Sequence, residues 1–326
     1  MADVEIGLFL SGGLDSSIIG GIMLDPRVRK YLTATKGKLK SFAVGQEGSP
    51  DILAARAVSK YLGTDHYEAI FTPDMAFDVL EKIIWHMETY EPELIRSCIP
   101  NYFLAKKAAE HVKVVITGEG SDEIWSGYLY YADCDDAILL QQENRRILKA
   151  VQQANLQRAD RMTMAHSLEA RVPFFDVDNI AKVMRVDPSE KLITEEKCEK
   201  YMLRRLYEDI LPKEVVWRTK AMQCEGVGMT WVKVLQDHIS QNLVTDAEFS
   251  KAQEQFPKNT PKTKEEYYYR SVFEKYYPGR DKFVHVWEGG CRAGGAPWKN
   301  SKYTREGLIN VELLKRGHGL AHQISI

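Results

Sequence analysis

The sequence predicts an α/β fold in which a doubly wound, mostly parallel sheet is followed by a helical lobe. Two observations predict this class. Short apolar runs alternate with segments of helical spacing in the first half of the chain, and helical patterns take over from about residue 139. Strands and helices that alternate along a chain favour a parallel sheet covered on both faces. We expect an α/β region over residues 1–138, a mostly helical lobe over 139–290 and an irregular tail over 291–326.

The expected elements follow from apolar spacing and from turn residues. The apolar runs that we expect to be strands cover residues 5–10, 39–44, 66–71 and 112–117, and the last of these is the final clear strand. Pro26 is expected to stop the helix that follows the first strand, and Ser49 can cap a helix over 52–62. The remaining helical patterns cover residues 73–87, 100–111, 147–164, 179–184, 196–209, 230–243 and 264–276.

Composition excludes several classes of protein. With 326 residues, of which 44% are hydrophobic and 28% charged, the chain can bury a core and is no disordered tail. Its 44 basic and 46 acidic residues give a net charge of -2, so no global positive field attracts nucleic acid. Five cysteines without a CxxC pair indicate a reduced, cytoplasmic setting, and we expect neither a signal peptide nor a membrane span.

The strongest functional signal is the run Ser-Gly-Gly-Leu-Asp-Ser-Ser that joins the first strand to the first helix, here called the serine–glycine loop (residues 11–17). Gly12 and Gly13 let the backbone approach a ligand closely, and the first amides of the helix point outward without a partner. The hydroxyls of Ser11, Ser16 and Ser17 add neutral donors. This combination predicts a binding site for an anion such as pyrophosphate at the positive end of the helix dipole.

Two other phosphate-binding patterns do not match this loop. A Walker loop needs a lysine followed by serine or threonine, and a dinucleotide-binding loop needs G-x-G-x-x-G; neither stands here. The plainer alternative is a tight turn between strand and helix with an incidental serine cap. Two glycines, three serines and an aspartate at one turn exceed what such a cap needs.

Carboxylates next to this loop predict a metal ion. Asp15 would be repelled by bound phosphates unless a cation lay between them. Glu119, Asp122 and Glu123 form a second acidic segment, here called the acidic loop (residues 118–123), directly after the last strand. Since parallel strands end at the same edge of a sheet, we expect Asp15 and Asp122 to hold one Mg²⁺ that bridges phosphate oxygens. The plainer reading of the acidic loop is an acidic helix N-terminus.

The serine–glycine loop resembles the PP-loop of the ATP pyrophosphatase superfamily, whose fold is of the adenine nucleotide alpha-hydrolase type. Further motifs occur in the order seen in the synthetase domain of class B asparagine synthetases, and they lie at residues 41–45, 49–51, 95–97, 118–123, 167–174 and 217–220. The resemblance covers most of the chain to about Trp231 and is weaker after it. It implies a ligase in which the side-chain carboxylate of aspartate attacks the α-phosphate of ATP, pyrophosphate leaves, and ammonia then displaces AMP to give asparagine.

The resemblance also implies roles for the matching residues. The groups that would bind ATP and pyrophosphate are Leu10, Ser11, Gly12, Gly13, Asp15, Ser16, Ser17, Val44, Thr117 and Gly118, and the metal would be held by Asp15 and Asp122. Arg96 and Lys220 would neutralise the departing pyrophosphate, the electrostatic role that nucleotidyl transfer needs. Glu119 is similar to the family glutamate linked to acyl-adenylate formation, and it would accept a proton from the attacking ammonia. Without the resemblance, Arg96 and Lys220 would be read as surface charges.

Two departures from the family pattern bear on the substrates. Family members commonly begin with a catalytic cysteine that opens a glutaminase domain, whereas this sequence begins almost at the first expected strand. The glutaminase is then a separate subunit, or the sequence is a fragment, or free ammonia or another amine is used. After Lys220, Ala221–Gly226 replaces the usual Glu-Gln-Phe-Ser-Asp-Gly. This change in the expected lid favours, as an alternative, a related amide or lactam synthetase that acts on another acid.

Three further expectations remain. A PP-loop enzyme that modifies tRNA would need a basic RNA-binding face or a catalytic cysteine pair, and the sequence has neither. A nucleotide sensor without turnover would not need Asp15, Arg96, Glu119, Asp122 and Lys220 together. Glu169 and Arg171 are expected to form a buried ion pair that braces the helical lobe.

Overall fold

A five-stranded parallel sheet forms the centre of the molecule. The computed structural model describes residues 3–32, 34–218, 220, 231–287 and 295–298. The strands are β1 (Ile6–Phe9), β2 (Lys40–Gly45), β3 (Asp65–Ile70), β4 (Val114–Ile116) and β5 (Glu169–Arg171), and they lie in the order β3-β2-β1-β4-β5. Every neighbouring pair runs parallel. The predicted α/β class and parallel sheet are therefore confirmed.

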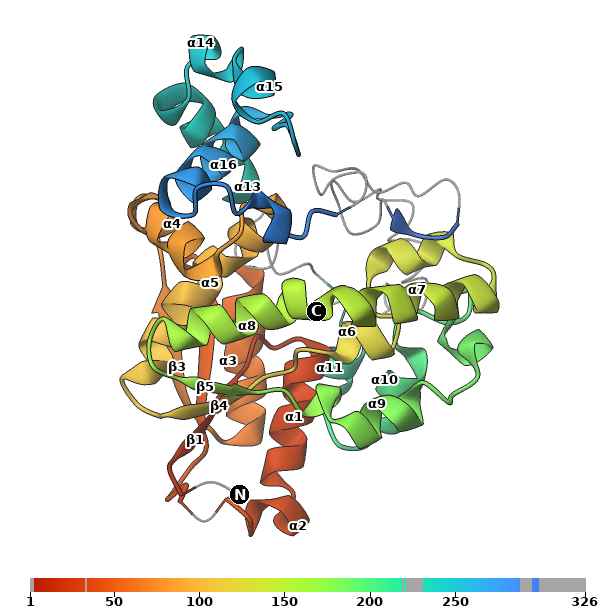
Figure 1. Cartoon of the computed structure of the whole chain (residues 1–326). Coiled ribbons are helices and arrows are strands. Elements are labelled where there is room, and N and C mark those ends of the chain that lie inside the picture. Colours follow the sequence, from red (N-terminus) through yellow and green to blue (C-terminus); the bar gives the residue numbers. More distant parts are fainter. Residues whose placement is uncertain (1–2, 33, 219, 221–230, 288–294, 299–326) are drawn as a thin grey trace.

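Alternate residues of the strands contribute side chains to two hydrophobic cores, one on each face of the sheet. Ile6, Leu8 and Val114 pack in one core with residues of the first helix, whereas Phe42 and Val115 pack in the other. Successive side chains of a strand point to opposite faces, so a sheet that is apolar on both faces needs helices on both. Figure 1 shows those helices around the sheet.

The helices of the first half connect the strands. They are α1 (Leu14–Leu24), α2 (Pro26–Arg29), α3 (Pro50–Leu62), α4 (Pro73–Met87), α5 (Pro92–Ala109), α6 (Ser121–Ile124) and the 3₁₀ helix η1 (Leu129–Asp133). Helix α4 has the predicted bounds, and Thr72 caps it by accepting from the Met75 amide. Pro26 ends α1 but also begins α2, since proline at the first turn has no amide to leave unpaired.

Helices dominate the second half, as predicted. They are α7 (Ala137–Ala150), η2 (Val151–Gln153), α8 (Asn155–Met164), η3 (Pro173–Phe175), α9 (Val177–Val183), η4 (Pro188–Lys191), α10 (Tyr201–Leu206), α11 (Lys213–Val216), α13 (Trp231–His238), the π-helical η5 (Ile239–Leu243), α14 (Asp246–Phe249), α15 (Ala252–Gln255), α16 (Lys264–Tyr276) and η6 (Asp281–Phe283). Helices α13 and α16 pack on α4, and Figure 1 shows α14 and α15 beyond them, far from the N-terminus.

Several predicted boundaries are wrong. Strand β5 adds a strand after the expected last one, and the Glu169–Arg171 ion pair that we expected to be buried lies at an exposed edge, with 58% of the Glu169 side chain accessible. Helix α5 begins at Pro92 and contains Pro100, which we had placed at a helix start. The helix expected over 147–164 is split by η2, and only 201–206 is α-helical within 196–209.

The predicted division at residues 138 and 290 stays a prediction, although β5 joins the sheet from beyond the first of these. The predicted irregular tail lies outside the described residues except for 295–298.

Candidate active site

The serine–glycine loop and the acidic loop lie against each other. Strands β1 and β4 are neighbours, with Leu8 paired to Ile116, so the loops that follow them leave the same edge of the sheet. A Cβ atom added to Gly118 would lie 2.9 Å from the Ser16 nitrogen and 3.0 Å from the Asp15 carbonyl carbon. Gly118 therefore lets the two backbones touch, and the loops form one site as the parallel topology predicts.

Internal hydrogen bonds hold the serine–glycine loop in shape. The Ser17 hydroxyl donates to the Gly13 carbonyl at 2.7 Å, and the Ser16 hydroxyl does so at 3.2 Å. The Ser11 amide donates to the Ser16 hydroxyl, and the Gly13 amide donates to the Ser11 hydroxyl. Gly12 adopts the left-handed region with φ of 72°, where a Cβ atom would also clash with the backbone of α3.

The residues expected to contact adenosine lie along the same edge of the sheet. Leu10 follows β1, and its amide donates to the Phe42 carbonyl at 2.8 Å. Val44 belongs to β2, while Thr117 and Gly118 follow β4. Since β1 lies between β2 and β4, these positions flank the serine–glycine loop. Their role in binding adenosine stays a prediction.

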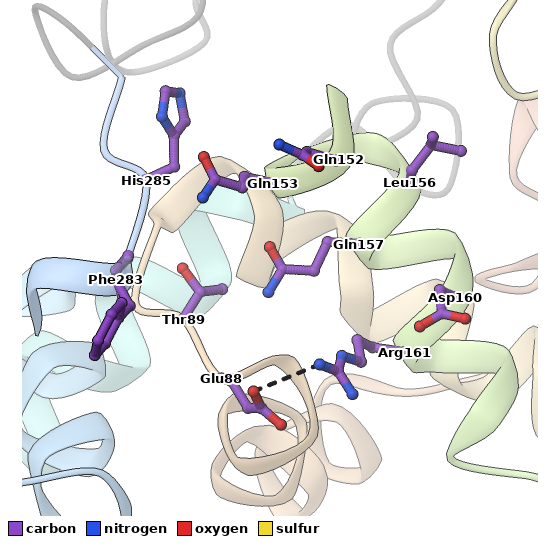
Figure 2. Close-up of a pocket in the computed structure, with 11 residues that line it drawn as sticks. Glu88, Thr89, Gln152, Gln153, Leu156, Gln157, Asp160, Arg161, Phe283 and His285 are labelled. Carbon is purple, nitrogen blue, oxygen red and sulfur yellow. Dashed lines mark hydrogen bonds and ion pairs between the residues drawn. The ribbon is translucent and has the colours of Figure 1, made fainter. Parts of the chain in front are cut away.

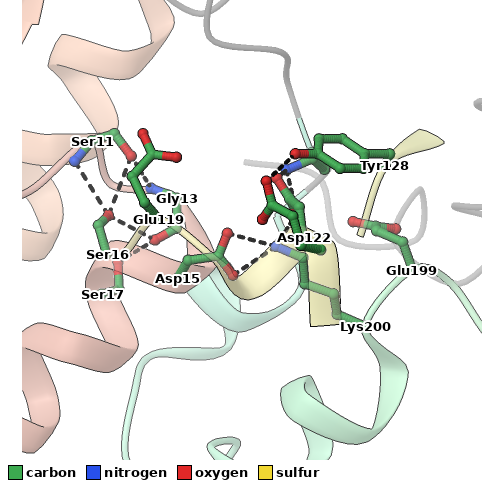
Figure 3. A network of polar contacts seen from close by, with 12 residues as sticks. Ser11, Gly13, Asp15, Ser16, Ser17, Glu119, Asp122, Tyr128, Glu199 and Lys200 are labelled. Carbon is green, nitrogen blue, oxygen red and sulfur yellow. Dashed lines mark hydrogen bonds and ion pairs between the residues drawn. The ribbon is translucent and has the colours of Figure 1, made fainter. Parts of the chain in front are cut away.

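A lysine that sequence reasoning missed joins the two loops. The Lys200 ammonium lies 2.5 Å from Asp15 Oδ2 and 2.5 Å from Asp122 Oδ1 (Figure 3). Lys220 adds a second contact to Asp122, 2.8 Å from Oδ2. Figure 3 shows Lys200 between the two aspartates, with the serines on the side of Asp15 away from Lys200. Asp15, Asp122 and Lys220, three of the predicted site residues, are thus in one ionic cluster.

Charge at this cluster is strongly stabilised. Burial alone would favour the neutral acid, but Lys200 and Lys220 hold the pKa of Asp122 far below its usual value. Burial likewise disfavours a charged lysine, yet Asp122 and Asp15 raise the pKa of Lys200 above its usual value. Asp122 and Lys200 therefore stay ionised over the physiological range.

Glu119 is held by a second cation that the sequence reasoning missed. Arg158 of α8 donates from Nη2 to Glu119 Oε1 at 2.5 Å and from Nη1 to the Ser97 hydroxyl at 3.2 Å. Burial works against the charged guanidinium, yet Glu119 raises the pKa of Arg158 above its usual value. Nothing near Arg158 or Lys200 in the sequence marks either one, because both fall inside ordinary helical spacing patterns, 147–164 and 196–209.

Glu123, the third acid of the acidic loop, has a structural role. Its side chain is buried and accepts hydrogen bonds from the Tyr128 hydroxyl at 2.6 Å and from the Asn155 amide at 2.7 Å. These bonds connect α6 to the start of α8. Glu123 therefore braces the acidic loop from behind.

The Arg96 side chain contacts helix α16. Its guanidinium makes a two-fold contact with Glu265 of α16, at 2.8 Å from Nε to Oε1 and 2.5 Å from Nη2 to Oε2. Gln236 and Tyr269 also donate to Glu265. Within the described ranges, no hydrogen bond or ion pair joins Arg96 to either loop of the site. Its predicted role at the pyrophosphate stays a prediction.

The two aspartates fit a divalent cation. Lys200 shows that one cation can contact both carboxylates, and hard carboxylate oxygens are the ligands that Mg²⁺ takes in proteins. No group of three or more His, Cys, Asp and Glu suited to a metal occurs in the part of the chain that the structure describes. A metal held by Asp15 and Asp122 would therefore need further oxygens, and phosphates of the substrate are one source.

A separate pocket of about 410 Å³ lies between the end of α4, the region from η2 to α8, and η6 (Figure 2). Its walls combine apolar side chains with Gln153, Gln157 and an ion pair between Glu88 and Arg161 at 3.4 Å. None of its lining residues was among the predicted site residues.

Comparison with known proteins decides the family. A family model described as asparagine synthase matches residues 1–137 and 135–301. The chain belongs to the asparagine synthase family. The serine–glycine loop and the acidic loop both lie in the first segment that the family model matches, and Lys200 and Lys220 lie in the second.

Curated relatives from plants and animals carry the family name. Glutamine-hydrolyzing asparagine synthetase 1 of Arabidopsis thaliana is 42% identical over 291 residues, which cover 85% of this chain and 49% of the relative. The root asparagine synthetase of Pisum sativum is 43% identical over the same shares. The asparagine synthetase of Gallus gallus is 40% identical over 296 residues, 88% of this chain and 52% of the relative. The chain thus spans about half the length of the asparagine synthetases it matches.

Among the residues whose structure is described, no helix is both long enough and apolar enough to cross a bilayer.

Proposed function

We propose that the chain is an ATP-dependent carbon–nitrogen ligase of the asparagine synthetase type. It would adenylate the side-chain carboxylate of aspartate, release pyrophosphate and let ammonia displace AMP to form asparagine. The observation that carries the proposal is the cluster in which Asp15, Asp122, Lys200 and Lys220 meet at the edge of the sheet where β1 and β4 end. Family membership and an identity of about 40% to asparagine synthetases support it.

The serine–glycine loop would hold the pyrophosphate half of ATP. Gly13 precedes α1, so the first amides of that helix offer donors to phosphate oxygens at its positive end. The hydroxyls of Ser11, Ser16 and Ser17 can turn from their internal bonds to the ligand. Leu10, Val44, Thr117 and Gly118 would offer backbone groups to adenosine.

Asp15 and Asp122 would hold Mg²⁺, which when bound neutralises phosphate charge and so assists departure of the pyrophosphate. Lys220 contributes a further positive charge beside Asp122. As negative charge develops on the leaving pyrophosphate, this ammonium would stabilise it. Arg96 would join it only after exchanging its contact with Glu265.

Glu119 would act on the acceptor side of the reaction. Its carboxylate lies in the acidic loop, one residue from Gly118, and the Glu119 amide donates to the Thr117 hydroxyl at 3.0 Å. Arg158 holds one carboxylate oxygen, so the other is available to take a proton from the attacking ammonia. A proton acceptor beside the acyl carbon is what aminolysis of the acyl-adenylate needs.

The ammonia source is part of the proposal. The relatives are named as glutamine-hydrolyzing, and this chain spans about half of their length. We propose that ammonia reaches this site either free or from a glutaminase that lies on a separate subunit or on a further part of the same protein.

The test is an assay of the purified chain with ATP, Mg²⁺, ammonium and aspartate. We expect AMP, pyrophosphate and asparagine in equal amounts, together with aspartate-dependent exchange of labelled pyrophosphate into ATP. Asp15→Asn should abolish the exchange, whereas the surface variant Asp25→Asn should retain it. Absence of exchange with every acid tried, in a chain that is folded and binds ATP, would refute the proposal.

A second candidate keeps the ATP chemistry and changes the acceptor. The observation that favours it is the segment 221–226, which differs from the family pattern at the expected lid and lies outside the described residues. The same exchange assay, run with other amino acids and dicarboxylic acids, separates the two: stimulation by another acid and none by aspartate would establish a related amide or lactam synthetase.

A further inference from the structure

Lys200 occupies an unusual place for a lysine. Only 2% of its side chain is exposed, and its backbone adopts the left-handed region with φ of 55°, which is unfavourable for a residue with a side chain. Gly127 makes room for it, since a Cβ atom there would overlap both Lys200 Cε and Asp122 Oδ1. The surrounding structure therefore fixes the ammonium between Asp15 and Asp122.

The charges in this cluster balance without any ligand. Asp15 and Asp122 carry two negative charges, and Lys200 and Lys220 carry two positive ones. Both oxygens of Asp15 lie within 2.7 Å of the Lys200 ammonium. Without that ammonium the two carboxylates would repel each other across a buried space. In the free chain Lys200 thus does the work that a metal ion would do.

We propose that Lys200 is a positioning residue that holds Asp15 and Asp122 together in the free chain and passes to a phosphate oxygen when the magnesium complex of ATP binds. A buried ammonium that leaves its carboxylates must find another anion, and the serine–glycine loop places phosphate beside it. This inference rests on the proposed ATP chemistry. It means that the chain binds a divalent cation poorly alone and well together with a polyphosphate.

Binding of Mn²⁺, measured by electron paramagnetic resonance and by calorimetry without any acceptor acid, tests the inference. Lys200→Met removes the competing charge, so we expect the variant to bind Mn²⁺ alone about tenfold more tightly than the unaltered chain. In the presence of pyrophosphate we expect the opposite change, about tenfold weaker binding of pyrophosphate, because one of its cations is lost. A role confined to packing would not shift these two affinities in opposite directions.

Lys191→Met is the matched control. Lys191 is also a buried lysine, 5% exposed, but its ammonium donates to the carbonyls of Ile124 and Val183 and, among the residues whose structure is described, to no carboxylate. We expect both affinities to stay within about twofold of the unaltered chain, a change of about 0.4 kcal/mol at most. Circular dichroism and thermal unfolding show whether each variant is folded.

Two results would overturn the inference. One is a folded Lys200→Met variant whose affinity for Mn²⁺ alone is unchanged or weaker. The other needs no variant: the unaltered chain would bind Mn²⁺ as tightly without pyrophosphate as with it. Neither measurement contains aspartate or ammonia. If the proposed asparagine synthesis failed, the affinities for Mn²⁺ and pyrophosphate would still test the role of Lys200.

Discussion

The Arg158 guanidinium contacts the Glu119 carboxylate at 2.5 Å and thereby ties α8 to the acidic loop. Only 9% of the Arg158 side chain is exposed, so solvent screens this contact little. The same arginine reaches the Ser97 hydroxyl on α5. Glu119 is therefore fixed relative to α5 and α8, and a fixed position is what general base catalysis requires of a carboxylate.

Replacing Glu119 by glutamine should remove the proton acceptor and keep the shape. We expect asparagine formation to fall at least about 100-fold, the usual contribution of a general base, while ATP still binds. Rates of AMP and asparagine formation measure the loss, and titration with ATP measures binding. Glu169→Gln is the matched control, because Glu169 forms an exposed ion pair with Arg171 at 2.6 Å. Equal losses in the two variants would contradict a special role for Glu119.

Gly118→Ala should push the two loops of the site apart. The added methyl group would lie 2.9 Å from the Ser16 nitrogen, closer than backbone atoms tolerate, and such overpacking costs about 1–3 kcal/mol. We expect the affinity for ATP to fall about tenfold. At Gly21, in α1, an added Cβ would meet side chains at ordinary distances of 3.5 and 3.6 Å. Gly21→Ala should bind ATP normally, and an unchanged affinity in Gly118→Ala would show that the loops do not touch as described.

Glu265→Gln should destabilise the fold by about 3 kcal/mol, because it leaves the Arg96 charge buried without its partner. The Glu265 side chain is 2% exposed and that of Arg96 is 10% exposed. Urea unfolding followed by circular dichroism measures the free energy. Lys233→Gln breaks an exposed pair with Asp237, and we expect it to change the stability by less than about 1 kcal/mol. Similar values for the two variants would show that the Arg96–Glu265 pair does not join α5 to α16.

Stability should depend on pH through His166. Burial, helped by the positive charges of Lys82 and Lys106, lowers the pKa of His166 to about 4 in the folded chain. In the unfolded chain the imidazole has its usual pKa near 6.5. Between these values the unfolded state binds the additional proton, so this histidine makes stability fall as the pH drops from about 6.5 to about 4.

The variant that tests this is His166→Gln, whose side chain does not titrate. We expect the unfolding free energy of the variant to fall less steeply over that pH range than that of the unaltered chain. Urea titrations at several pH values between 4 and 7 give the two slopes. Identical slopes would mean that His166 has the same pKa in both states.

Much of the site could be predicted because it depends on neighbouring strands. Parallel strands end at one edge of a sheet, so Asp15 after β1 and Asp122 after β4 were expected to meet, and they do share the Lys200 ammonium. Lys200 and Arg158 themselves could not be predicted. Lys200 is separated from Asp15 by 185 positions in the sequence, and Arg158 is separated from Glu119 by 39. Periodic patterns in a sequence indicate helices and strands, and they do not indicate contacts between residues so far apart.

The wrong boundaries have local causes. Strand β5 is the three-residue run Glu-Ala-Arg at the edge of the sheet, with none of the apolar alternation that marks a strand. Pro100 was placed at a helix start because proline disrupts helix interiors. In α5, however, every residue from Leu94 to Ala105 is buried, and that packing outweighs the cost of the missing amide.

The sequence separation of 185 residues from Asp15 to Lys200 also has a consequence for biosynthesis. At about 5–20 residues per second, a ribosome makes Lys200 roughly 10–40 s after Asp15. During that interval β1 to β4 can already pair, while the aspartates still face water without their ammonium. The ionic cluster can therefore form only after the strands that position it have been made, and a chain interrupted before Lys200 contains all five strands but lacks the ammonium that joins the two aspartates.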